Sequence, residues 1–267
     1  EFNNIKTTDF NLFNPSMSFT DDSILTIAVA DWLMGEMQTR EALVATLKEY
    51  VRRYPHPMGG YGARFNTWAK SSQPEPYNSW GNGSAMRVAA VGWAFDTLEK
   101  TEEVAALSAE VTHNHPEGIK GAQATAAAVF MARKGSTKTA IKDYVESRYG
   151  YDLSRSCDDI RPAYRFNESC RDTVPQAMVA FLDSTDFESA IRLAVSLGGD
   201  SDTLACITGG IAEAFYGMNS PVPAHLVDVG VTDLKSYILH QLPVDLRRVV
   251  ERFYSLFFNS APRNFPA

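Results

Sequence analysis

The chain has 267 residues, with 32 acidic and 25 basic side chains, so its formal net charge is −7. This length predicts one large domain or two small ones, with enough chain to bury a core without a disulfide or a metal. The acidic balance argues against a protein that holds nucleic acid through its phosphates, although a small anionic ligand could still be bound by backbone amides.

The three cysteines are Cys157, Cys170 and Cys206, and no two of them have the spacing of a metal or redox motif. Such cysteines predict neither a disulfide framework nor a zinc finger, and they fit a reducing compartment. No apolar run reaches the ~18 residues that a membrane span needs, and no secretory signal opens the chain. We therefore expect a cytoplasmic protein without a membrane partner, whose oligomeric state the sequence leaves open.

Apolar residues recur at helical spacing along almost the whole chain, and no strand-like alternation persists. Pro55 follows the second predicted helix, Pro116 stands in the first turn of a long alanine-rich one, and Gly135 ends that helix. This pattern predicts an all-α protein. In chain order, the predicted helices cover Thr20–Gly35, Thr39–Arg53, Ser84–Leu98, Glu102–His113, Glu117–Arg133, Thr137–Tyr149, Thr173–Asp183, Phe187–Leu197, Asp202–Tyr216 and Pro243–Phe258.

Two long segments between these helices carry several aromatic rings. The first, His56–Gly81, includes Tyr61 and Trp68, and the second, Gly150–Asp172, includes Phe166. Long loops in a compact helical protein are often functional. The rings either bind a ligand or pack back onto the helices, and composition alone does not separate these two interpretations.

Two acidic clusters each stand at a predicted helix start, Thr20-Asp21-Asp22-Ser23 and Gly198-Gly199-Asp200-Ser201-Asp202-Thr203. Such residues can simply cap the free amides of a helix N-terminus. A cap needs one oxygen, however, whereas the two segments offer four carboxylates, which repel one another unless a cation lies between them. Because Mg²⁺ takes oxygen ligands, the clusters predict a site for two divalent cations with a bridging carboxylate.

Two further polar segments surround predicted helix ends. In Ser79-Trp80-Gly81-Asn82-Gly83-Ser84, the glycines let backbone amides approach an anion, and Trp80 offers a flat face to a nucleobase. The same residues also suit an ordinary turn with a helix cap. In Thr112-His113-Asn114-His115-Pro116-Glu117, the histidines do not have the spacing of a helical zinc site. His113 is therefore either a helix-end residue or a polar contact to a substrate.

Taken in this order, the four segments, with the histidine segment extended to Ala122, resemble the ADP-ribosylglycohydrolase family. This family includes the dinitrogenase-reductase-activating glycohydrolase and the ADP-ribosyl-acceptor hydrolases. The similarity covers essentially the whole chain and implies a single domain over residues 1–267. It also implies an all-α orthogonal multi-helix bundle, with a cleft that holds two Mg²⁺ ions or Mn²⁺ in their place.

The resemblance implies roles for individual residues by matching position. The implied metal ligands are Thr20, Asp21, Asp22, Asp200, Asp202 and Thr203, with Asp202 as the bridging one. The implied substrate-binding residues are Ser79, Trp80, Gly81, Asn82, Gly83, Ser84 and His113. Glu1, which could otherwise be a cloning remnant, becomes a candidate catalytic carboxylate together with Asp21 and Asp200. The family's first helix would then precede Glu1, so we expect this chain to lack it.

The implied activity is metal-dependent hydrolysis of the glycosidic bond between ADP-ribose and an acceptor. Arginine of a modified protein is the first expectation for the acceptor, and serine or a small molecule are the others. Two cations can orient the ribose hydroxyls and activate water, a carboxylate can move the proton, and an anionic cluster suits an oxocarbenium-like transition state. The alternatives are a non-catalytic ADP-ribose-binding or structural relative, or a binuclear hydrolase of another nucleotide sugar.

Overall fold

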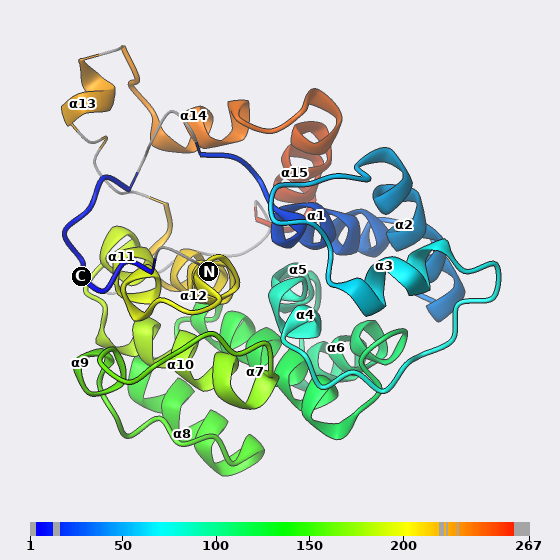
Figure 1. The fold of residues 1–267 in the computed structure, drawn as a ribbon, viewed down its shortest axis with the longest axis horizontal. Coiled ribbons are helices and arrows are strands. Elements are labelled where there is room, and N and C mark those ends of the chain that lie inside the picture. Colours follow the sequence, from blue (N-terminus) through cyan, green and yellow to red (C-terminus); the bar gives the residue numbers. More distant parts are fainter. Residues whose placement is uncertain (1–3, 13–16, 219–221, 223, 229, 259–267) are drawn as a thin grey trace.

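In the computed structural model, the described residues are 4–12, 17–218, 222, 224–228 and 230–258, and most of them are helical. Figure 1 shows short and long helices that cross one another in a bundle. Within the described ranges no strand forms, and the extended pairings are two single bridges, Thr20 with Met58 and Gly81 with Ser169. The prediction of an all-α fold is therefore confirmed, whereas a single domain without the family's first helix stays a prediction.

The helix bounds follow the predicted order, with additions. The helices are α1 (Asp21–Leu33), α2 (Arg40–Arg53), α3 (Ala63–Lys70), α4 (Gly83–Met86), α5 (Ala89–Ala94), α6 (Leu98–Glu110), α7 (Pro116–Arg133), α8 (Lys138–Tyr149), α9 (Cys157–Ile160), α10 (Cys170–Asp183), α11 (Phe187–Leu197), α12 (Ser201–Tyr216), α13 (Ala224–Val227), α14 (Leu234–His240) and α15 (Val244–Phe257).

The centre of the bundle is α7, which packs against α4, α5, α6, α8, α10 and α12 (Figure 1). The buried residues of this helix are mostly alanine and glycine, including Gly118, Gly121 and Ala126. Small side chains let neighbouring backbones approach closely, because little volume stands between the helix axes. The alanine-rich segment is therefore the axis around which the helices that carry the polar segments are arranged.

The predicted helix Ser84–Leu98 is wrong in its length, because the chain forms two short helices there, with Arg87 and Val88 between them. The following helix also starts earlier than predicted. The Thr97 side chain accepts a hydrogen bond from the Lys100 amide at 3.2 Å, so it caps the helix that begins at Leu98. The spacing of apolar residues did not reveal the break at Arg87 and Val88 or the helix start at Leu98. The start at Leu98 depends on a hydrogen bond of the polar Thr97 side chain.

The long segment before the glycine-containing loop contains α3, which the sequence did not predict. Phe65 and Trp68 of this helix are buried, and their rings stack with centroids 5.4 Å apart. These two rings therefore pack onto the bundle, as one of the two interpretations of the aromatic loops expected. Tyr61, in the same segment, lines a cavity, to which Phe65 also contributes.

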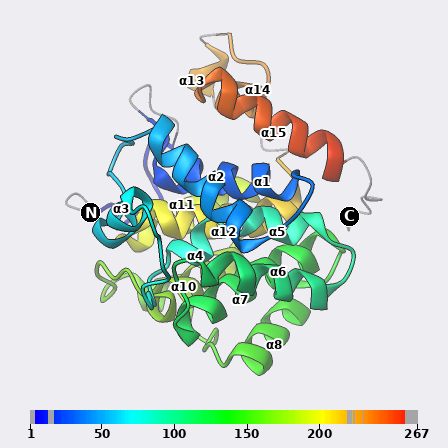
Figure 2. The same ribbon diagram turned by 90° about the vertical axis from the view of Figure 1, so that its right-hand side faces the viewer.

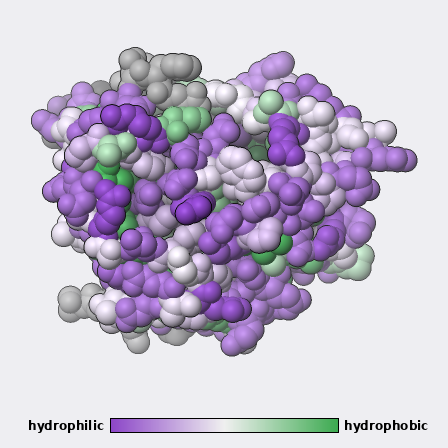
Figure 3. Space-filling model, turned by 60° about the horizontal axis from the view of Figure 1, so that its bottom comes forward, coloured by the Kyte–Doolittle hydropathy of each residue, from purple (hydrophilic) through white to green (hydrophobic). Residues whose placement is uncertain are grey.

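The last helices form an outer layer. Figure 2 shows α14 and α15 at the edge of the bundle, with α15 beside α1. Asp245, in the first turn of α15, accepts a hydrogen bond from the Tyr54 hydroxyl at 2.6 Å and pairs with Arg53. No described helix is long and apolar enough to cross a membrane, and the face in Figure 3 is mostly hydrophilic with small separate hydrophobic patches.

The contact between α5 and α7 gives a stability prediction. A β-carbon on Gly92 would lie 2.5 Å from Val129 Cβ and 2.8 Å from the Ala126 carbonyl oxygen, so the helices would have to separate. We expect Gly92→Ala to lower the free energy of unfolding by about 1–3 kcal/mol despite the better helix propensity of alanine. Urea unfolding measures this change. Gly62→Ala is the control, because its β-carbon would meet no atom within 4 Å; equal stability of both variants would contradict the prediction.

Candidate active site

The two predicted acidic clusters meet at one place in the fold. Asp21 and Asp22 open α1, and Asp200, Asp202 and Thr203 stand at the start of α12. All five residues line one cavity of about 470 Å³. The two helices thus begin side by side, although their first residues are separated by most of the chain.

Capping does not account for these side chains. Thr20 and Asp200 occupy the N-cap positions of their helices, yet neither side chain makes a capping hydrogen bond. Thr20 Oγ1 instead donates to Asp22 Oδ2 at 3.0 Å. Asp22 is only 4% exposed, and its Oδ1 atom is buried with no hydrogen-bond partner. A buried oxygen of this kind is costly unless something else binds it.

The crowding of carboxylates shifts their proton affinities. Burial, followed by the charge of Asp202, raises the pKa of Asp21 to about 7. The same two causes, together with the neighbouring Asp21, raise the pKa of Asp22 to about 7. Burial and Asp202 also raise the pKa of Asp200 to about 7, against a hydrogen bond from Asn82 that lowers it. Without a cation, the cluster therefore holds protons at neutral pH that isolated aspartates would have lost.

Asn82 joins the glycine-containing loop to this cluster. Its Nδ2 atom donates to Asp200 Oδ2 at 2.7 Å and to Thr173 Oγ1 at 3.2 Å. The Asn82 backbone amide donates to the Glu168 carbonyl oxygen at 2.7 Å, so the loop is also held by the segment before α10. Asn82 is thus a positioning residue for one of the carboxylates, in addition to its predicted contact with a substrate.

The remaining predicted substrate-binding residues divide into two groups. Ser79, Gly81, Asn82, Gly83 and His113 line the same cavity as the carboxylates. The other two, Trp80 and Ser84, do not. Trp80 is 50% exposed, so its ring is available at the surface beside the loop, whereas Ser84 is fully buried and donates to the Gly118 carbonyl oxygen at 2.7 Å. The position of Ser84 is that of a link between α4 and α7.

Other residues line the cavity that sequence reasoning did not single out as site residues. Arg64, Tyr77 and Glu168 lie around it, together with the rings of Tyr61, Phe65 and Phe166. The Arg64 guanidinium stands 4.8 Å from the centre of the Tyr77 ring. The only sequence signal for these residues was the aromatic content of the two long loops, because nothing in the sequence shows that the two loops meet.

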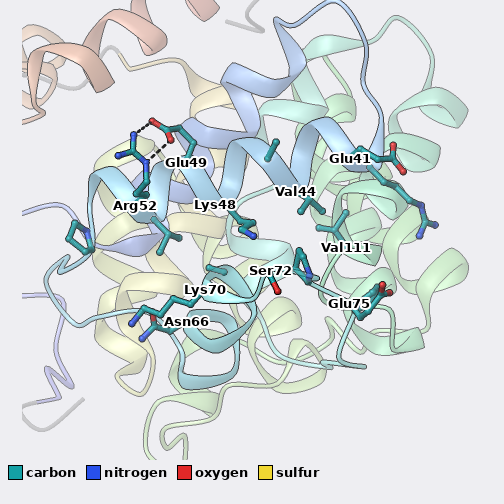
Figure 4. Close-up of a pocket in the computed structure, with 17 residues that line it drawn as sticks. Glu41, Val44, Lys48, Glu49, Arg52, Asn66, Lys70, Ser72, Glu75 and Val111 are labelled. Atoms are coloured by element: carbon teal, nitrogen blue, oxygen red, sulfur yellow. Dashed lines mark hydrogen bonds and ion pairs between the residues drawn. The ribbon is translucent and has the colours of Figure 1, made fainter.

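A larger hollow, of about 1100 Å³, lies elsewhere on the molecule (Figure 4). It runs between α2 and the segment around α3, and Glu49 and Arg52 on its edge form an ion pair with each other. None of the predicted site residues lines it. The smaller cavity is the candidate active site, because the carboxylates, the glycine-containing loop and His113 all converge there.

The donor set at this cavity fits a hard divalent cation. It consists of carboxylate and hydroxyl oxygens, it includes the orphaned Asp22 Oδ1, and its carboxylates resist ionisation when no cation is near. Within the described part of the chain, no three acidic, histidine or cysteine side chains converge closely enough to enclose an ion. The carboxylates would therefore have to turn toward a cation as it binds.

Glu1, the first candidate catalytic carboxylate, lies outside the described residues. The described residues that follow it are attached to the segment leading into the second acidic cluster. Asn4 Oδ1 accepts a hydrogen bond from the Gly199 amide at 2.9 Å, and the Lys6 ammonium donates to the Tyr164 carbonyl oxygen at 2.9 Å and to the Leu197 carbonyl oxygen. The catalytic role of Glu1 stays a prediction.

Comparisons with known proteins agree with the family that the motifs suggested. The family model described as ADP-ribosylglycohydrolase matches residues 2–257. ADP-ribosylhydrolase ARH3 of Gallus gallus is 27% identical over 269 residues, which cover 78% of this chain and 73% of that protein. ADP-ribosylarginine hydrolase Tri1 of Pseudomonas putida is 28% identical over 149 residues, which cover 54% of this chain and 40% of that protein.

The fold is also that of a solved structure. A structure described as an ADP-ribosylglycohydrolase-related protein complex superposes with a TM-score of 0.65 at 23% identity, and the match covers 89% of this chain and 81% of that one. The family match over most of the sequence and the shared fold lead to one conclusion: the chain belongs to the ADP-ribosylglycohydrolase family and is an ADP-ribosyl glycohydrolase.

Proposed function

We propose that this enzyme hydrolyses the bond between ADP-ribose and an arginine side chain, in a reaction that depends on two divalent cations. The proposed cation dependence is supported by the crowded carboxylate cluster, in which the buried Asp22 Oδ1 atom has no hydrogen-bond partner. Thr20, Asp21, Asp22, Asp200, Asp202 and Thr203 are the residues that would hold the ions. When bound, Mg²⁺ or Mn²⁺ would orient the ribose hydroxyls and acidify a water molecule.

The protein's own residues supply the remaining steps of the proposed reaction. Asn82 orients the Asp200 carboxylate through the 2.7 Å hydrogen bond. Asp200 or Asp21 is the carboxylate proposed to take a proton from the attacking water or to give one to the leaving group, since both line the cavity. Carboxylate oxygens near the sugar can stabilise the positive charge that develops on it as the glycosidic bond breaks.

The choice of arginine rests on the chemistry of the cavity wall. An ADP-ribosylated guanidinium is a planar cation, and Glu168, Tyr61 and Phe166 are among the residues that line the cavity. Carboxylates and aromatic faces both attract guanidinium groups. The similarity to a protein named ADP-ribosylarginine hydrolase supports the same choice.

The direct test is release of ADP-ribose from defined substrates. We expect the protein with Mg²⁺ to release ADP-ribose from ADP-ribosyl-arginine, to do so faster than from ADP-ribosyl-serine, and to stop when EDTA is added. Faster cleavage of the serine substrate would overturn the arginine assignment alone. Release that continues in EDTA would overturn the cation dependence, and no release from any ADP-ribosyl substrate would overturn the proposed activity.

A single substitution tests the metal ligands. We expect Asp202→Asn to lower kcat at least about 100-fold and to weaken Mg²⁺ binding, because the predicted bridging carboxylate loses its charge. Isothermal titration calorimetry measures the binding. The matched control is Asp96→Asn, because the Asp96 side chain is fully exposed and remote from the cavity. Wild-type turnover in Asp202→Asn would refute the ligand assignment.

The raised pKa values predict how stability depends on pH. Asp21, Asp22 and Asp200 have pKa values of about 7 in the fold, above the usual value of 3.8. The folded protein therefore binds more protons than the unfolded chain between these values, so the metal-free fold loses stability as pH rises from about 4 to about 7.

Thermal unfolding checks this dependence. In EDTA, we expect a lower melting temperature at pH 7.5 than at pH 5.5, and a higher melting temperature for Asp22→Asn than for the wild type at pH 7.5. Mg²⁺ should raise the melting temperature of the wild type more at pH 7.5 than at pH 5.5, since it replaces the protons. A wild-type protein destabilised by Mg²⁺, or Asp22→Asn destabilised in EDTA, would contradict the repulsion that we infer.

A further inference from the structure

A buried arginine lies beneath the cavity without a carboxylate partner. Arg87 is 1% exposed, and none of the ion pairs among the described residues includes it. Its Nη2 atom donates to the Ser108 carbonyl oxygen and to Thr112 Oγ1, each at 2.9 Å. Burial lowers the pKa of Arg87 to about 10, so the side chain is still a cation at neutral pH and can only donate hydrogen bonds.

The Arg87 guanidinium occupies one acceptor position of the Thr112 hydroxyl oxygen. Thr112 Oγ1 accepts a hydrogen bond from Arg87, and its other hydrogen-bond partner among the described residues is His113 Nδ1, at 2.7 Å. A threonine hydroxyl can accept two hydrogen bonds but has a single hydrogen to donate. Among the described residues this buried hydrogen has no acceptor other than the nitrogen, so it points there. His113 Nδ1 is therefore the acceptor in this pair, and in the neutral ring the proton is carried by Nε2.

The ring is neutral for a separate reason. His113 is 5% exposed, and burial together with the charges of Arg87 and Arg64 holds its pKa well below the usual value. The neutral ring can exist in two tautomers, and a partner at one nitrogen selects between them. Within the described residues, Thr112 is the only hydrogen-bond partner of the ring's Nδ1, and Arg87 in turn donates to Thr112.

The opposite nitrogen faces the glycine-containing loop and the cavity. A β-carbon on Gly83 would lie 3.2 Å from His113 Nε2, and one on Gly81 would lie 3.6 Å from it, so the absence of side chains at both positions keeps this nitrogen uncovered. His113 and both glycines line the cavity. No hydrogen bond from Nε2 is recorded to any described residue, so its hydrogen is available to a bound molecule.

We propose that Arg87 and Thr112 are positioning residues that hold His113 as its Nε2–H tautomer, so that Nε2 donates a hydrogen bond to a phosphate oxygen of the substrate. This inference rests on the proposed function for the identity of the substrate. The buried charge of Arg87, without a carboxylate to neutralise it, makes an anionic oxygen the favoured acceptor over a hydroxyl. Thr112 matters through the direction of its hydroxyl, which no apolar side chain of the same shape can reproduce.

The test reads the tautomer directly. Two-bond ¹H–¹⁵N correlation spectra of ¹⁵N-labelled full-length protein distinguish Nε2–H from Nδ1–H, and the His113 signals are assigned by their loss in His113→Gln. We expect the Nε2–H form in the wild type and in Thr112→Ser, and a substantial Nδ1–H population in Thr112→Val. The dissociation constant for ADP-ribose in Mg²⁺ should rise about tenfold in Thr112→Val and stay within about threefold in Thr112→Ser, as for loss and retention of one hydrogen bond.

Each measurement can overturn a separate part of the proposal. A wild-type ring that carries its proton on Nδ1, or on both nitrogens, overturns it without any variant, as does Thr112→Val that keeps the Nε2–H form. If Thr112→Val does not fold, Thr112→Ala takes its place with the same expected shift of tautomer. An unchanged dissociation constant despite the expected tautomers overturns the phosphate contact. Failure of the wild type to bind ADP-ribose with the expected tautomer present overturns the proposed function instead, since the spectra do not depend on activity.

Discussion

The proposed chemistry of this protein depends on the proximity of carboxylate oxygens at the adjoining ends of α1 and α12. Asp22 is buried with an unpartnered oxygen, and Asp21 and Asp200 are pushed toward neutrality by burial and by Asp202. A fold that brings these groups together loses stability at neutral pH unless cations or protons offset the repulsion. The same carboxylates supply the oxygen ligands that the proposed reaction needs for its cations. The cluster therefore accounts both for the loss of stability and for the proposed chemistry.

The rest of the bundle holds that cluster in place from several directions. The small residues of α7 allow α4 and α12 to pack closely against α7. Gly118 of this helix also lies close to the Ser79 carbonyl oxygen and to His113. Asn82 then connects the glycine-containing loop to Asp200. The loop, the carboxylates and the histidine are thus supported by one central helix, which explains why the longest alanine-rich stretch in the chain contains no candidate functional side chain yet lies next to the site.

Two kinds of polar contact can be separated at this cavity. The carboxylates of the two helix starts are suited to cations and to the ribose, whereas the neutral His113 imidazole and the buried Arg87 guanidinium, which line the same cavity, suit an anion. ADP-ribose joins a sugar to a diphosphate, so one ligand would meet both surfaces. This division also resolves how an acidic protein can bind a diphosphate, because net charge does not describe the field inside a single cavity.

The sequence by itself determined the all-α class, the approximate span of most long helices and the family, because helical periodicity and short ordered motifs are local properties. It also indicated the two acidic clusters, since four carboxylates exceed what two helix caps need. The tertiary structure decided which of these residues share a cavity and that Ser84 is a buried link. It also decided that Tyr61, Phe65 and Phe166 line the site while Trp68 packs into the core. It also decided the surroundings of His113, because Thr112 contacts the ring and Arg87, from the segment between α4 and α5, is brought to Thr112 by the packing of α4 against α6 and α7. Burial and partner geometry are properties of contacts between distant segments, and a single sequence does not encode them in any local pattern.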